Sequence, residues 1–212
     1  MKTPIPSLDM EPSSIPWPKP GDVLFQEDAD CSHNACLNLG GKHWGAYASA
    51  YKEAADILVQ RFLEDSKGLD ALTYPILFLY RHHLELRLKE LIAQGQGLLH
   101  QPIDLQEQHG LVKLWQPCHK ILREIWPKEP AVTWDTVEKL IKEFDRMDPA
   151  GDSFRYPITS KKKGHQPTLP NLDRVGIPNL YEIMQRLASF FEGHLDGVDA
   201  YRGEEDGSFD GA

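Results

Sequence analysis

Hydrophobic residues recur at helical spacing along most of the chain between Trp44 and Leu195. Apolar residues repeated every three or four positions turn one face of a helix toward a core. Such patterns cover about residues 44–62, 69–93, 110–125, 133–147 and 172–194. Strands, which would alternate apolar and polar residues between hairpin turns, are nearly absent from the pattern. The sequence therefore predicts an all-α, up-and-down bundle of about five helices.

The second of these segments is apolar on most of its circumference. Its main stripe is Ile76, Leu77, Tyr80, Leu84, Leu88 and Leu91, and Phe78, Leu79 and Leu86 lie on other sides. A helix that is apolar on most sides lies at the centre of its domain. Pro75 predicts a kink or a restart, because proline is tolerated in the first turn of a helix but not in its interior. Apolar area beyond what one neighbour covers also predicts a symmetric homodimer.

The two ends of the chain differ from the predicted bundle domain, residues 44–197. Residues 1–43 include Pro4, Pro6, Pro12, Pro16, Pro18 and Pro20, which predict an irregular, proline-rich arm. Residues 198–212 are acidic and rich in glycine, which predicts a disordered tail. A long link, residues 148–171, separates the last two helices and carries four prolines.

Composition narrows the classes of function. With 212 residues and a formal net charge of -9, the chain fits one main domain and is not a generally basic protein that coats nucleic acid. Contact with RNA would require a local basic patch. Three cysteines and no charged leader before an apolar run predict a cytoplasmic protein. No apolar run approaches the roughly 20 residues that span a bilayer, so no membrane association is expected.

The central helix carries charges where a core helix should be apolar: residues 80–91 read YRHHLELRLKEL. In one interpretation, Arg81 with Glu85 and Glu85 with Lys89 are ordinary surface pairs, worth about 0.2–0.5 kcal/mol each. In the other, these charges face a cleft, because burying a charge alone is very costly. An arginine beside two histidines is suited to phosphodiester chemistry, since histidine exchanges protons near neutral pH and arginine binds phosphate.

Over residues 44–195 the chain resembles the helical HEPN superfamily, through YPILFLYRHHLELRLKEL, HGLVKLW and DSFRYP. The resemblance implies a dimeric bundle. It also implies either a metal-independent ribonuclease with paired Arg and His in a cleft, or an inactive partner, in toxin–antitoxin or phage-defence systems. Active members place several residues between that Arg and His, whereas His82 and His83 follow Arg81 at once. Either a divergent set of Arg81, His82 or His83, and His109 is catalytic, or catalysis is absent.

These observations give two hypotheses, beside the possibility of an effector that acts only when a partner or a small ligand opens the cleft. The first is a HEPN-like, RNA-binding, metal-independent endoribonuclease in which His82, His83 or His109 takes the ribose 2′-hydroxyl proton and Arg81 stabilises phosphate charge. The second is a noncatalytic dimerising or regulatory module that binds a protein partner. His109 joins the site only if the third helix packs against the second near Arg81.

The link supplies the candidate RNA-binding residues, which are Arg155, Lys161, Lys162 and Lys163. The lysine run fits either a solvated loop or a clamp on the phosphate backbone. Arg155 lies between two aromatic residues, so we expect it to be drawn inward and paired with Asp148, Asp152 or Glu85.

A possible metal site lies in CSHNAC, which holds Cys31, His33 and Cys36. Sulfur and imidazole ligands suit zinc, but this spacing matches no common zinc pattern. No motif for a nucleotide cofactor, a serine nucleophile or a zinc protease is present. The sequence predicts no metal and no cofactor, and it leaves open whether these three residues bind one.

Overall fold

A computed structural model describes residues 17–37, 44–64, 70–104 and 107–209. The chain divides into two compact units, an N-terminal unit, Met1–Gly41, and a helical unit, Lys42–Ala212. The described part of the N-terminal unit is irregular apart from a 3-10 turn at Cys31–His33, which the side chain of Asp30 caps. This agrees with the predicted irregular arm.

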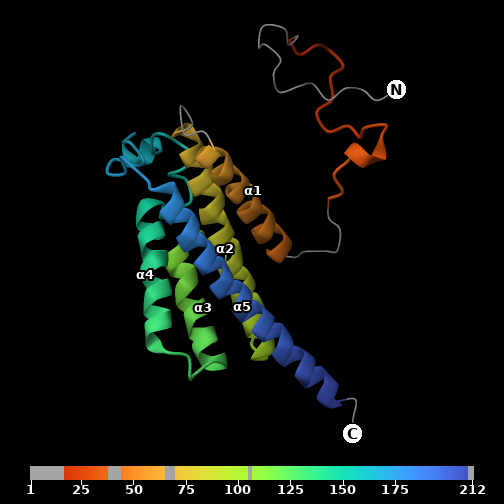
Figure 1. Cartoon of the computed structure of the whole chain (residues 1–212), viewed down its shortest axis with the longest axis vertical. Coiled ribbons are helices and arrows are strands. Elements are labelled where there is room, and N and C mark those ends of the chain that lie inside the picture. The colour runs from red at the N-terminus through yellow and green to blue at the C-terminus, as the bar shows by residue number, and fades with distance from the viewer. Residues whose placement is uncertain (1–16, 38–43, 65–69, 105–106, 210–212) are drawn as a thin grey trace. The chain divides into compact units, whose positions relative to one another are not determined.

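The helical unit contains the five predicted helices (Figure 1). They are α1 Trp44–Glu64, α2 Thr73–Leu98, α3 Leu111–Ile125, α4 Ala131–Met147 and α5 Ile177–Phe209. The described residues form no strand. The link contains a 3-10 turn, Lys161–Lys163, and an isolated bridge between Ile158 and Pro167. The all-α prediction is confirmed.

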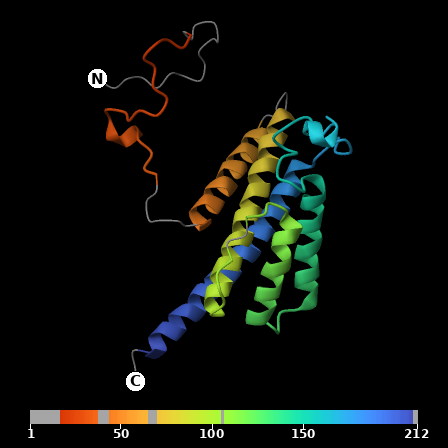
Figure 2. The same ribbon diagram turned by 180° about the vertical axis from the view of Figure 1, so that it is seen from behind.

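Helix α2 lies at the centre of the helical unit, as its pattern predicts. It contacts α1, α3 and α5, and α4 packs against α3 (Figures 1 and 2). Its apolar stripe is buried, and so are charged residues on its other sides. Because one chain covers α2 on most sides, its apolar circumference no longer argues for a dimer. Homodimerisation stays a prediction.

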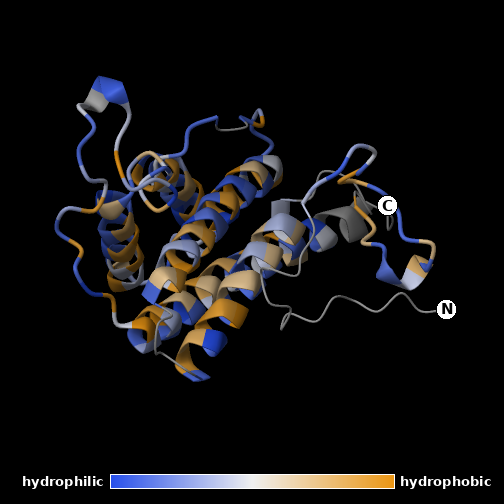
Figure 3. Cartoon of the chain, turned by 90° about the horizontal axis from the view of Figure 1, so that it is seen from above, coloured by the Kyte–Doolittle hydropathy of each residue, from blue (hydrophilic) through white to orange (hydrophobic). Residues whose placement is uncertain are grey.

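Hydrophobic side chains from all five helices form one core, which includes Leu84, Trp115, Ile141 and Phe191. In Figure 3, hydrophobic and hydrophilic positions alternate around the helices, as expected for elements that bury one side. None of the described helices is both long and apolar enough to span a membrane.

The first residues of α2 and α4 can be compared with the local sequence signals for a helix start. A 3-10 turn at Asp70–Leu72 precedes α2, and Pro75 lies in the first turn of α2, so the predicted restart is confirmed. The fourth helix, whose pattern begins at residue 133, starts two residues earlier, since α4 begins at Ala131 with Pro130 as its N-cap residue. Proline fixes its own backbone angle and can end the preceding loop without a side-chain cap.

The C-terminal helix is shifted relative to the pattern. It begins at Ile177, so the apolar residues just before it belong to the link. It continues to Phe209 and therefore includes the first part of the segment predicted as a tail, residues 198–212. Residues 210–212 of that segment lie outside the described residues.

Candidate functional site

Arg81 is the most deeply buried charged group on α2 and is 2 % exposed. Its Nη1 donates to Glu85 Oε2 at 2.9 Å, and its Nη2 donates to the backbone oxygen of His109. Its Nε donates to the backbone oxygen of Asp148 at 3.1 Å and lies 3.2 Å from Asp148 Oδ2. One guanidinium thus joins α2 to the loop before α3 and to the residue after α4.

Glu85 is the centre of this network. Its Oε1 accepts hydrogen bonds from Lys89 Nζ at 2.9 Å and from His109 Nδ1 at 2.8 Å. Burial alone would raise the pKa of Glu85, but the hydrogen bonds from Lys89, His109 and Arg81 outweigh it and hold that pKa below its ordinary value. The carboxylate is therefore charged at neutral pH and orients the His109 ring.

The turn after α4 is built around Arg81. Asp148 is fully buried, and its Oδ1 accepts the backbone N–H groups of Asp152 and Ser153, each at 2.8 Å. Gly151 has a φ of +79°, and a Cβ there would lie 3.1 Å from Arg81 Nη1. Glycine is needed here because the backbone is left-handed and approaches the guanidinium closely.

A cavity of about 260 Å³ opens beside this network. It is lined by Phe78, Arg81, His82, Glu85, His109, Ala150, Gly151 and Arg155. Among these lining residues, two cations, Arg81 and Arg155, outnumber the one carboxylate, that of Glu85. The excess of positive charge suits an anionic ligand.

The two histidines of the cavity differ in environment. The His109 side chain is 64 % exposed, so its ring is open to solvent while Nδ1 is bound to Glu85. His82 is half-buried, with its ring edge-on to Tyr51 and stacked on Phe78. Burial lowers the pKa of His82, so this imidazole is neutral at pH 7 and can accept a proton.

His83 lies apart from the cavity, although it is next in sequence to His82. It is fully buried, and its Nδ1 lies 2.9 Å from the backbone oxygen of Ala48 in α1. Burial lowers the pKa of His83 to about 4. Helical geometry explains the separation, because adjacent residues point about 100° apart.

The condition for including His109 is met, because its backbone and its ring both contact α2 residues. Arg155 also lines the cavity, but the prediction that it is drawn inward is wrong. It is exposed, and Arg81 takes the expected partners Asp148 and Glu85. Lys161 and Lys162 are exposed on a 3-10 turn of the link and do not line this cavity, and the side chain of Lys163 lies outside the described residues.

The sequence did not single out Asp148 or Phe78 as parts of the site. Asp148 contributes through the folded turn after α4, and Phe78 through its stacking on His82. The spacing of Phe78 and His82, four residues apart on one helix, was a usable signal for that contact.

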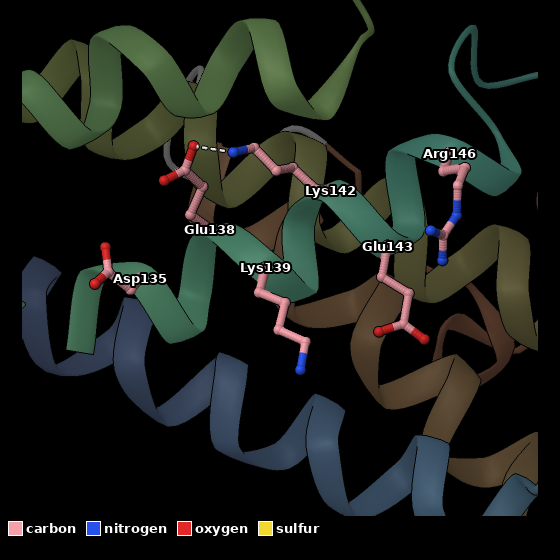
Figure 4. A pocket seen from close by; sticks show the side chains of 6 residues that line it. All are labelled: Asp135, Glu138, Lys139, Lys142, Glu143 and Arg146. Atoms are coloured by element: carbon pink, nitrogen blue, oxygen red, sulfur yellow. Dashed lines mark ion pairs between the residues drawn. The ribbon is translucent and has the colours of Figure 1, made fainter. Parts of the chain in front are cut away.

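A larger hollow of about 420 Å³ follows one side of α4 (Figure 4). Six charged side chains of mixed sign line it: Asp135, Glu138, Lys139, Lys142, Glu143 and Arg146. They are mostly exposed, and Glu138 pairs with Lys142 at 2.6 Å. All six come from one helix, so we interpret this hollow as a solvated helix face.

The cysteines of the N-terminal unit, Cys31 and Cys36, are exposed free thiols, and His33 lies 3.8 Å from Asp28. Across the described ranges, no three His, Cys, Asp or Glu side chains come together in a metal-binding group.

Comparisons with known proteins give no match: no family model, curated protein or solved structure matches this chain.

Proposed function

We propose that this chain is a HEPN-like protein that binds RNA and cleaves it without a metal at the cavity beside Arg81. The observation that carries the proposal is the meeting of His82 and His109 with Arg155 in one cavity. Two imidazoles can act as general base and general acid in RNA phosphodiester transfer, and a cation can stabilise the charge on the phosphate.

In this mechanism His82, neutral because its pKa is lowered, accepts the proton of the ribose 2′-hydroxyl. The 2′-oxygen attacks phosphorus, and the bond from phosphorus to the 5′-oxygen breaks. His109, held by Glu85 through Nδ1, protonates the departing 5′-oxygen from Nε2. The products are a 2′,3′-cyclic phosphate and a 5′-hydroxyl, and the next turnover requires proton exchange with water.

The arginines have separate roles in the proposal. Arg155 is exposed and stabilises the negative charge that develops on the phosphate oxygens. Arg81 is buried with its nitrogens bonded, so it positions Glu85 and His109 and does not contact substrate. The resemblance to HEPN proteins would place such an activity in a toxin–antitoxin or phage-defence system.

The test is cleavage of a mixed RNA pool in EDTA by the wild type, His82→Phe and His109→Ala. Phenylalanine keeps the ring packing of His82 but transfers no proton. Each variant should lose about 100-fold or more of the rate, the usual contribution of a general acid or base. His33→Ala, which changes a histidine of the N-terminal unit outside the cavity, is the matched control and should keep full activity. Wild-type rates in both variants would contradict the mechanism.

A noncatalytic partner-binding module is the second candidate. It is favoured by the network itself, since Arg81, Glu85 and Lys89 satisfy one another inside the fold. RNA left whole by a wild type that is folded by circular dichroism would support this function over cleavage.

A further inference from the structure

Planar groups form a continuous series beside the cavity. The rings of His82 and Phe78 stack with centroids 5.9 Å apart and planes 6° apart. The Arg155 guanidinium carbon lies 5.7 Å from the Phe78 centroid and 5.4 Å from the Tyr156 centroid. We call these four residues, His82, Phe78, Arg155 and Tyr156, the stacking ladder. It leads from α2 into the link.

At the outer end of the stacking ladder, Tyr156 has an anchored backbone and a solvent-exposed ring. Tyr156 is 56 % exposed. Its backbone N–H donates to the backbone oxygen of Asp152 at 3.2 Å, and its backbone oxygen accepts from Thr168 Oγ1 at 2.6 Å. A large ring that is exposed on an anchored backbone is a ready surface for a flat ligand.

Hydrogen bonds to backbone oxygens also hold Arg155 in place. Its Nε donates to the backbone oxygen of Gly151 at 2.9 Å, and its backbone N–H donates to the backbone oxygen of Asp152 at 3.1 Å. Within the described structure, Nη1 and Nη2 of Arg155 have no hydrogen-bond or ion-pair partner. The guanidinium can therefore contact an anion while its carbon stays within cation–π distance of the two rings.

An aromatic ring next to a free guanidinium matches one kind of ligand. Unpaired bases stack on aromatic side chains, and a neighbouring cation holds their phosphate. A duplex hides the faces of its bases inside the helix, so it cannot use such a surface. Because the chain carries a net charge of -9, a local contact of this kind is needed for nucleic-acid binding.

We propose that the stacking ladder selects single-stranded RNA, with one unpaired base stacked on Tyr156 and the adjacent phosphate held by Arg155. The inference rests on the proposed function, because it names the substrate class of the same cavity. Base stacking tolerates all four bases, so the ladder selects strandedness and not sequence.

The experiment measures equilibrium binding of a short fluorescent RNA in which every ribose carries a 2′-O-methyl group. This RNA lacks the internal nucleophile and cannot be cleaved by the proposed mechanism, so binding is separated from cleavage. The full chain and its variants are titrated against the single strand and against the matching duplex. Tyr156→Ala removes the ring, Tyr156→Phe keeps it, and Tyr201→Ala removes a part-exposed tyrosine of α5 as a control.

We expect the wild type to prefer the single strand. Tyr156→Ala should weaken its binding about tenfold, the size of effect that one stacked base gives. Tyr156→Phe and Tyr201→Ala should stay within about twofold of the wild type, since stacking is unchanged in both. Raised salt should weaken binding, because Arg155 contributes through charge.

Three results would overturn the inference: no binding of the single strand by the wild type, equal binding of strand and duplex, or unchanged binding by Tyr156→Ala. These are distinguishable from failure of the proposed cleavage. A wild type that binds through Tyr156 but leaves unmodified RNA whole retains the ladder and loses the nuclease mechanism. If the wild type cleaves RNA and Tyr156→Ala binds it normally, the nuclease mechanism is retained and the stacking ladder is contradicted.

Discussion

At the scale of single residues, burial decides what each charge on α2 does. The predicted pairs of Glu85 with Arg81 and with Lys89 both exist, at 2.9 Å each. Of the two interpretations of these charges, that of ordinary surface pairs of small value is wrong, because all three residues are less than one-tenth exposed. A buried pair is costly to break, because removing one partner leaves the other uncompensated.

Arg81→Ala should therefore lower the free energy of unfolding by about 3–5 kcal/mol. It leaves Glu85 and Asp148 without their shared cation. Urea denaturation followed by circular dichroism measures the change. Arg186→Ala is the matched control, since Arg186 pairs with Glu182 on the exposed face of α5 and should matter by less than about 0.5 kcal/mol. Equal changes in the free energy of unfolding for the two variants would contradict a structural role for Arg81.

Burial of His83 makes the stability of the fold depend on pH, and the sign of this dependence follows from the direction of its pKa shift. Burial lowers its pKa from 6.5 to about 4, with the cations of Arg87 and Lys52 acting in the same direction and the Ala48 backbone oxygen and Asp56 opposing them. Between these values the unfolded chain binds a proton that the folded chain does not. Stability from His83 is thus present above pH 6.5 and is lost as the pH falls toward 4.

His83→Asn, whose amide can donate to Ala48 in place of Nδ1, should flatten the stability curve between pH 6.5 and 4. The wild type should lose roughly 3 kcal/mol more than this variant across that window, since one pKa unit is worth about 1.4 kcal/mol. Urea midpoints at several pH values measure the difference. His33→Asn, which replaces an exposed histidine of the N-terminal unit in the same way, is the control with which the change at His83 is compared. Parallel curves for the wild type and His83→Asn would contradict the assignment.

At the scale of elements, a glycine lets α2 and α3 approach closely. Gly95 lies on α2 where α3 packs. A Cβ at Gly95 would overlap Cγ2 of Ile121 in α3. The absence of a side chain at Gly95 therefore allows the short distance between the two helices at this point.

Gly95→Ala should destabilise the protein by about 1–3 kcal/mol, the usual cost of overpacking a core. Gly193→Ala, on an open face of α5, should instead stabilise it by about 0.5–1 kcal/mol, because alanine favours helix more than glycine does. Thermal or urea unfolding measures both. A neutral or stabilising Gly95→Ala would show that α3 can move away without cost.

At the scale of the helical unit, the link after α4 completes the site. It brings Gly151 against Arg81 and places Arg155 over Phe78. Sequence predicted the link as irregular, but its contacts with α2 depend on the packing of α4 against α3. Whether a second copy of the chain adds residues to the cavity stays a prediction of the HEPN resemblance.

The sequence by itself determined the helices, the central place of α2 and most cavity residues, because periodicity and residue type are local properties. His82, His109 and Arg155 were found this way. Tertiary structure decided which of these groups meet. Both His82 and His83 contact α1, but His83 is fully buried against the Ala48 backbone, whereas His82 packs beside Tyr51 at the border of the cavity. Arg81 rather than Arg155 takes Asp148, because a turn stabilised by distant packing delivers that carboxylate to α2.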